Sequence, residues 1–219
     1  MLDRRSFILS AAALALLPLA GSALLPLTGS AWAQATFPDA PEGFFADRPL
    51  PEMEMGSPDA PVVLTEYASV TCPYCKAFHE TTLPKLKPMI DAGQVRYQAR
   101  EFASDPLAAA GFMLARCAPN GRDGYFGMLD ILYTQQAKWT RAANPADALF
   151  ELSRVAGFDR AGFEACLKDQ TMLDKLRDVR AEALRFGVEG TPTLFVNGEK
   201  VEGSDFESVE KAINGKLPS

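Results

Sequence analysis

The chain has 219 residues, of which 47% are hydrophobic and 23% are charged, and its formal net charge is -6. This acidic balance argues against a nucleic-acid-binding protein, because such proteins need a basic surface to displace counterions from phosphates. Four cysteines are too few for disulfides alone to stabilise a chain of this length, so its core must come from buried apolar side chains. The single histidine excludes a histidine-rich metal site.

Residues 1–33 have the features of a secretory signal peptide. The basic pair Arg4-Arg5 is followed by a long apolar stretch without a charge, and residues 31–33, Ala-Trp-Ala, have the small-x-small pattern of a cleavage site. We therefore expect export to the periplasm with cleavage after Ala33. The Arg-Arg-x-Phe pattern also fits a twin-arginine signal. An ordinary Sec signal and an uncleaved membrane anchor are the alternatives.

Residues 34–52 contain four prolines, which disfavour a helix and predict an extended N-terminal arm with little core of its own. A short strand is expected at 53–55. The next run, 62–67, is rich in β-forming residues and is bounded by Pro61 on one side and by small residues on the other. This pattern predicts a buried central strand.

A helix and a third strand are expected to complete one βαβ unit. Residues 75–90 have apolar residues at helical spacing, although Pro84 and Pro88 should kink or shorten that helix. Residues 94–102 then predict a strand parallel to 62–67, because a strand, a crossover helix and a parallel strand make one right-handed unit.

Residues 105–187 have helical periodicity and predict an all-helical insertion. Five helices are expected: 106–117, 125–138, one that starts at Pro145 after the N-cap Asn144, one capped by Asp159, and 172–186. The β pattern returns afterwards as a strand at 193–196, an Asn197-Gly198 hairpin turn, a strand at 200–201 and a helix at 205–213. The layout is a small α/β domain, residues 53–104 and 188–219, that the helical insertion interrupts.

The motif that indicates chemistry is Cys72-Pro73-Tyr74-Cys75, at the junction between the strand and the first helix. Cysteines at this spacing on a first helical turn bring their sulfurs within disulfide reach, and the helix N-terminus favours a thiolate on Cys72. A lowered pKa makes Cys72 a good leaving group and a Cys72-Cys75 disulfide oxidising. A structural disulfide and half of a zinc site are the alternatives. Zinc would need a second pair, and Cys117 and Cys166 lack that spacing, so no metal is expected.

Two further features lie near this chemistry in the sequence. His79 comes one helical turn after Cys75, and a lone histidine there is more often exposed or packed than a ligand. Thr191-Pro192 directly precedes the strand at 193–196. A proline at a strand start cannot donate to the ladder and could be cis, although an ordinary trans loop proline is the alternative.

In this order, the motifs resemble the DsbA-like branch of the thioredoxin superfamily. The resemblance rests on C-P-Y-C after an apolar strand, the lead-in at 56–62, the segment 187–193 and the helical block between them. It implies an α/β, thioredoxin-like fold with an inserted all-helical domain, and thiol:disulfide exchange without a cofactor. It also implies that Cys72 exchanges disulfides, that Cys75 resolves them, and that Thr191 and Pro192 bind the extended substrate backbone.

The resemblance assigns roles to three more residues. The family has a buried acid six residues before the first cysteine, where Glu66 stands in this chain. A carboxylate is costly to bury as an anion, so Glu66 could relay a proton to or from Cys75, and a solvent-facing side chain is the alternative. Pro73 and Tyr74 are expected to tune the redox poise. They differ from the Pro-His of the best-known DsbA oxidases, so the resemblance does not imply a strongly oxidising potential.

Cys117 and Cys166 each follow apolar residues on one face of a predicted helix. In an oxidising compartment, two such cysteines in one helical domain predict a structural disulfide. Some DsbA-like proteins of this layout have one. Two buried free thiols and a regulatory disulfide are the alternatives.

The expected function is that of a periplasmic thiol:disulfide oxidoreductase that donates the Cys72-Cys75 disulfide to reduced, unfolded exported proteins. The resemblance implies reoxidation by a membrane quinone-linked oxidase. The Pro-rich arm is too short for an oligomerisation domain, which favours a monomer. An isomerase or reductase kept reduced by a membrane donor, as in a copper-tolerance branch, is one alternative. A non-enzymatic periplasmic metal or peptide chaperone is the other.

Overall fold

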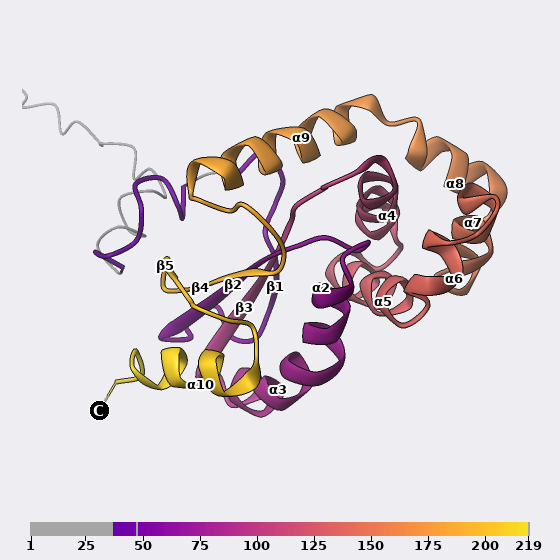
Figure 1. Ribbon diagram of the computed structural model, residues 1–219. Coiled ribbons are helices and arrows are strands. Elements are labelled where there is room, and N and C mark those ends of the chain that lie inside the picture. Colours follow the sequence, from indigo (N-terminus) through magenta and orange to yellow (C-terminus); the bar gives the residue numbers. More distant parts are fainter. Residues whose placement is uncertain (1–36, 47, 219) are drawn as a thin grey trace, which may run out of the picture.

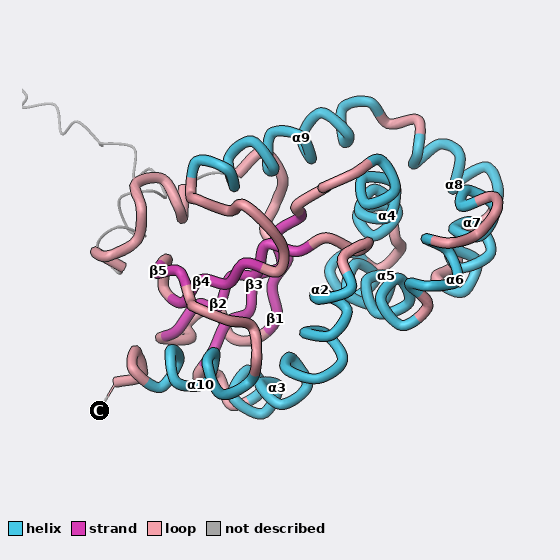
Figure 2. Tube along the Cα trace, viewed as in Figure 1, coloured by secondary structure: helices cyan, strands magenta, loops and turns pink. Residues whose placement is uncertain are grey.

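A five-stranded mixed sheet occupies one side of the molecule, and a group of helices extends from it on the other side (Figure 1). The computed structural model describes residues 37–46 and 48–218. The predicted signal peptide, residues 1–33, lies outside these described residues. Figure 2 shows the strands gathered together with helices above and below them. Within the described ranges, no helix combines the length and the apolar character that a bilayer crossing requires.

The sheet is built from both ends of the described chain. Its strands are β1 (Met53–Met55), β2 (Val62–Ala68), β3 (Val95–Glu101), β4 (Thr193–Val196) and β5 (Glu199–Lys200). Their order across the sheet is β1-β3-β2-β4-β5, so β2 is the central strand that the sequence predicts. β2 pairs in parallel with β3 and antiparallel with β4. The parallel pair, joined through a helical connection, confirms the predicted βαβ unit.

Every residue of β2 is buried, because both faces of the sheet are covered. Side chains alternate between the faces, so Leu64 and Ala68 face the larger core, which also contains most of the buried helical residues. Val63 and Tyr67 face a smaller core on the other side. The same alternation directs Glu66, a carboxylate, toward the larger core.

The smaller core corrects the prediction for the N-terminal arm. Residues 37–46 form successive turns rather than an extended segment, and Phe44 is fully buried against the rings of Tyr67, Phe186 and Phe195. The Arg100 guanidinium donates to the Phe44 carbonyl at 3.0 Å and lies 4.6 Å from the centre of its ring. The prediction of little core is wrong because the aromatic residues between the prolines pack onto the sheet.

A continuous helical run follows β2. It consists of α2 (Pro73–Ala77), a π-helical segment η1 (Phe78–Thr82) and α3 (Leu83–Asp91). Pro84 has no backbone N–H and cannot make the usual hydrogen bond to the preceding turn, and the wider π-helical turn lies just before it. The run starts earlier than the predicted residue 75, because Pro73 fits the first helical position.

Six helices form the insertion, one more than the sequence predicts. They are α4 (Pro106–Cys117), α5 (Gly121–Thr134), α6 (Gln136–Thr140), α7 (Pro145–Val155), α8 (Arg160–Leu167) and α9 (Gln170–Arg185). The helix predicted at 125–138 is divided at Gln135 into α5 and α6. α9 then runs back along the sheet (Figure 1), and α10 (Phe206–Asn214) follows β5 and packs near α3.

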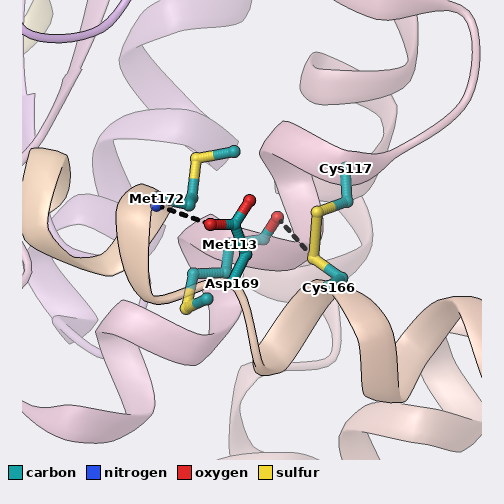
Figure 3. Close-up of a disulfide and its surroundings, with 5 residues drawn as sticks. All are labelled: Met113, Cys117, Cys166, Asp169 and Met172. Carbon is teal, nitrogen blue, oxygen red and sulfur yellow. Dashed lines mark hydrogen bonds between the residues drawn. A yellow bond between two sulfur atoms is a disulfide. The ribbon is translucent and has the colours of Figure 1, made fainter.

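A disulfide joins Cys117, at the end of α4, to Cys166 in α8 (Figure 3). The two cysteines are 49 residues apart in the sequence. Just beyond Cys166, the Asp169 side chain accepts a hydrogen bond from the Met172 N–H at 2.9 Å and caps α9. The bridge therefore ties the first helix of the insertion to α8, the helix that directly precedes its last helix.

The buried arm generates a stability prediction. Replacing Phe44 by Ala should lower the free energy of unfolding by about 3–5 kcal/mol, because a fully buried aromatic side chain is lost from the smaller core. Denaturant unfolding of the mature protein measures this change. The exposed neighbour Glu42 provides a matched control, since Glu42→Ala should change stability by less than about 0.5 kcal/mol. Equal effects of the two substitutions would show that the arm contributes nothing to the core.

Candidate active site

β2 leads directly into the two cysteines of the C-P-Y-C motif. The connecting loop folds back on itself, with the Cys72 N–H donating to the Ser69 carbonyl at 3.0 Å. Cys72 takes the N-cap position of α2, Cys75 lies in its first turn, and both are free thiols in this structure. Cys72 is partly exposed and Cys75 is fully buried. The Cys72 sulfur is therefore accessible to solvent, whereas the Cys75 sulfur is not.

The sheet brings Thr191 and Pro192 to the same place. Because β2 and β4 are antiparallel, the end of β2 lies beside the start of β4, and Tyr67 is opposite Thr193. The peptide bond between Thr191 and Pro192 is cis. The Cys72 thiol donates a hydrogen bond to the Thr191 carbonyl at 3.1 Å. This loop therefore lies against the exposed cysteine.

The surroundings of the two sulfurs move their pKa values in opposite directions. The pKa of Cys72 falls from its ordinary 9.0 to about 5, chiefly because the Cys75 thiol donates a hydrogen bond to its sulfur. The Thr191 side chain and the backbone N–H groups of Tyr74 and Cys75 lower it further, while partial burial opposes the change. Burial raises the pKa of Cys75, as do its contact with Cys72 and the charge of Glu66. The thiolate of the pair therefore resides on Cys72.

A residue of the insertion holds the loop before the motif. The buried side chain of Gln136, at the start of α6, donates from Nε2 to the carbonyls of Val70 and Cys72, both at 2.9 Å. Buried hydrogen bonds of this kind are costly to lose, because the carbonyls would have no water to replace the donor. Sequence reasoning missed this contact, since a single glutamine in a helical segment gives no signal of its partner.

Glu66 is fully buried, which excludes the alternative of a solvent-facing side chain. Its Oε2 accepts a hydrogen bond from the Tyr97 hydroxyl and lies 3.3 Å from Nε2 of His79. Its Oε1 has no hydrogen-bond partner among the described residues. Among the described contacts, this buried carboxylate therefore has the Tyr97 hydroxyl and the His79 imidazole as its polar neighbours.

His79 and two tyrosines complete a group that we call the buried acid cluster: Glu66, His79, Tyr97 and Tyr133. The His79 ring stacks on Tyr133 with 4.1 Å between ring centres, and its Nε2 lies 3.5 Å from the Tyr97 hydroxyl. Burial raises the pKa of both tyrosines, and the charge of Glu66 raises it further, so both remain protonated. Sequence reasoning missed these tyrosines. For His79 the only available signal was its spacing of one turn from Cys75.

The remaining predicted residues of the motif lie at the molecular surface. Pro73 takes the first position of α2, and the Tyr74 side chain is 72% exposed beside the partly exposed Cys72. Across residues 37–46 and 48–218, no three His, Cys, Asp or Glu side chains lie close enough together to hold a metal ion. The groups described above that can take part in chemistry are the two sulfurs and the buried acid cluster.

Comparison with known sequences identifies related proteins. Residues 50–215 match the family model described as Thioredoxin. A Rickettsia bellii protein, provisionally named a protein-disulfide oxidoreductase, is 30% identical over 167 residues, which cover 74% of this chain and 63% of that protein. A Bacillus anthracis protein, provisionally named disulfide bond formation protein D, is 29% identical over 174 residues, covering 76% and 78%. The chain spans less than two thirds of the length of its rickettsial relatives.

Solved structures show a similar arrangement of elements. Alpha-DsbA1 from Wolbachia pipientis superposes with a TM-score of 0.69 at 25% identity, over 77% of this chain and 92% of that one. Oxidised BdbD from Bacillus subtilis gives a TM-score of 0.67 over 76% of this chain and 92% of that one. Its identity is 20%, so this likeness concerns the fold alone.

The contacts around Cys72 generate a prediction for its ionisation. In the reduced protein, ultraviolet absorbance of the thiolate should titrate with a midpoint near pH 5, and Cys75→Ala should raise that midpoint more than Thr191→Val does. The order follows because the hydrogen bond from Cys75 is the largest cause of the lowered pKa. A midpoint near the ordinary value of 9.0 in the unsubstituted protein would contradict this description.

The same shift gives a signed prediction for stability. Because the folded-state pKa of Cys72 is depressed, its thiolate contributes stability that is fully present above the ordinary value of 9.0 and is lost as the pH falls through about 5. The stability of the reduced protein relative to the disulfide form should therefore rise between these two pH values. Denaturant unfolding of both forms at several pH values measures it, and a flat difference would contradict the prediction.

Proposed function

Since the chain belongs to the thioredoxin family, we propose that it is a DsbA-like thiol:disulfide oxidoreductase that donates a Cys72-Cys75 disulfide to other proteins. The family match and the structural superpositions confirm the thioredoxin-like α/β fold with its inserted helical domain. The relatives that are named protein-disulfide oxidoreductase and disulfide bond formation protein support the choice of reaction.

The observation that supports this proposal most strongly is the difference between the two sulfurs. Cys72 is partly exposed and has a pKa of about 5, whereas Cys75 is fully buried and has a raised pKa. Only Cys72 is accessible to an incoming thiolate, so it is the sulfur that is attacked. Its low pKa also makes it the better leaving group when a mixed disulfide is resolved.

The proposed reaction has two exchange steps. A substrate thiolate attacks the Cys72 sulfur, the Cys72-Cys75 bond breaks, and Cys75 leaves with the electron pair and takes up a proton. A second substrate thiolate then attacks the substrate sulfur of the mixed disulfide, and Cys72 leaves as a thiolate. The substrate loses two electrons and gains a disulfide, while the protein ends as the dithiol.

The proposed direction of transfer is oxidation of the substrate. Hydrogen bonds that stabilise the Cys72 thiolate stabilise the reduced protein, and a pair whose reduced form is stabilised gives up its disulfide readily. An isomerase or reductase would need the pair to be kept reduced by a donor. The same thiolate stabilisation works against the strongly reducing potential that a reductase requires.

We assign substrate binding to the loop beside Cys72. Thr191 and Pro192 lie against the exposed sulfur, and the extended chain of a partly unfolded protein could pair with the backbone there. Tyr74, which is exposed, offers an apolar contact next to the reacting sulfur. We infer that Pro73 and Tyr74 tune the potential through the start of α2, and that the Cys117-Cys166 disulfide is structural.

We also propose that the protein acts in the periplasm on reduced exported proteins, as a monomer, and is reoxidised by a membrane quinone-linked oxidase. The charge pattern of residues 1–33 and the presence of a disulfide in the insertion support an oxidising compartment. The redox chemistry requires an oxidant to restore the Cys72-Cys75 disulfide after each turnover.

Substitution of the exposed cysteine tests the proposal. The oxidised protein, mixed with a reduced unfolded substrate protein, should form substrate disulfides, and Cys72→Ser should abolish this activity because the Cys72-Cys75 disulfide can no longer form. Quantitative alkylation of the substrate thiols measures the reaction. A double Cys117→Ala and Cys166→Ala variant is the matched control and should keep the activity, because those sulfurs lie in the insertion.

Three results would count against this function. Full activity in the Cys72→Ser variant would exclude disulfide exchange through this motif. If the unsubstituted protein rearranges scrambled disulfides but does not oxidise dithiols, it is an isomerase. If it binds metal or peptide and exchanges no disulfide, it is a chaperone.

A further inference from the structure

A cavity adjoins the buried acid cluster at His79. Its volume is about 230 Å³, and its lining includes His79 together with the apolar side chains of Met55, Leu83, Ile90 and Phe126. Pro84 and two charged residues, Lys87 and Asp130, form the part of the lining that is exposed to solvent. The cavity therefore connects the surface with the His79 ring.

His79 also contacts the buried carboxylate. Its Nε2 lies 3.3 Å from Oε2 of Glu66, and its side chain is 11% exposed while that of Glu66 is fully buried. The other contact of Oε2 is the hydroxyl of Tyr97, which is itself fully buried. Among the described contacts of Glu66, His79 alone touches both the carboxylate and the cavity.

The proposed exchange reaction requires a proton at a buried atom. When Cys72 is attacked, Cys75 leaves as a thiolate in surroundings that strongly disfavour its charge. Cys75 lies in the same larger core as Leu64 and Ala68, on the face of β2 that also carries Glu66, and the charge of Glu66 acts on the Cys75 sulfur. A proton on Glu66 can therefore neutralise the leaving thiolate. Because Glu66 is fully buried, it cannot recover that proton directly from bulk solvent.

We propose that His79 carries the proton between Glu66 and solvent through this cavity. The proposal rests on the thiol:disulfide exchange proposed above. Glu66 gives its proton to the Cys75 thiolate and becomes a carboxylate, and the protonated imidazole of His79 then returns a proton to Glu66 and becomes neutral. A water molecule or buffer acid reprotonates His79 from the cavity. In the reverse direction the same groups pass the proton of Cys75 outward.

The groups around His79 favour this role. Glu66 on β2 attracts the imidazolium, and Tyr97 on β3 and Tyr133 on α5 are uncharged because their pKa values are raised. Asp130 on α5 and Lys87 on α3 line the same cavity with opposite charges, and both are exposed. On its own helical run, Lys76 and Glu80 pair with each other.

Two substitutions and a chemical rescue test the proposal. His79→Ala enlarges the cavity and removes the imidazole, whereas His79→Phe keeps a ring to stack on Tyr133 and removes only the proton-carrying nitrogen atoms. Both should slow single-turnover reduction of the oxidised protein by a dithiol peptide by roughly 100-fold, the usual effect of losing general acid-base catalysis. Added imidazole can enter the enlarged cavity of His79→Ala and should increase the rate of that variant about tenfold. It should leave the rate of His79→Phe unchanged.

Control measurements separate proton transfer from a structural role. Lys87→Ala alters the same cavity without removing the imidazole, and its rate should equal that of the unsubstituted protein. The thiolate titration of Cys72 should keep its midpoint in all three variants, which shows that the site is folded. Unchanged rates in His79→Ala and His79→Phe would overturn the proposal, as would a slow His79→Ala variant that imidazole does not rescue. Failure of the unsubstituted protein to react with the peptide would instead overturn the proposed function.

Discussion

The structure depends on an unequal solvation of two sulfurs that share one helical turn. Cys72 is partly exposed at the N-cap of α2, where a thiol and backbone N–H groups point at its sulfur and stabilise negative charge. Cys75 is fully buried and its thiolate is strongly disfavoured. A disulfide between two such sulfurs is attacked at one atom only and leaves a stabilised thiolate when it is reduced. The other residues of the site either maintain this difference in solvation or transfer the proton that Cys75 takes up when the disulfide is reduced.

Several parts of the fold maintain this difference in solvation between the Cys72 and Cys75 sulfurs. β2 ends at the motif, and its antiparallel partner β4 begins beside it, so the sheet register alone places Thr191 against Cys72. The insertion adds Gln136, whose amide holds two carbonyls of the loop. On the buried side of the motif, where Cys75 lies, Glu66 lies within the larger core beside His79. The sheet, the insertion and the cluster thus converge on one short segment of chain.

Local patterns in the sequence predicted the elements, and family resemblance predicted their assembly. The central strand, the Asn144 and Asp159 caps and the hairpin turn followed from residue types at fixed spacing, and the structure has them. The prediction for the arm is wrong because prolines disfavour a helix but do not prevent turns that bury an aromatic side chain such as Phe44. Contacts between distant segments had no local signal, which is why Gln136, Tyr97 and Tyr133 were missed. Whether a buried polar side chain has a partner depends on tertiary packing and not on its neighbours in the chain.

The central claim is that the site stabilises the reduced pair and so makes its disulfide oxidising. The equilibrium of the Cys72-Cys75 pair with a glutathione redox buffer tests it most directly, because that constant sums every interaction that distinguishes the dithiol from the disulfide. The account predicts a reduction potential well on the oxidising side of thioredoxin, whose potential is about -270 mV. A value near or below that of thioredoxin would contradict it.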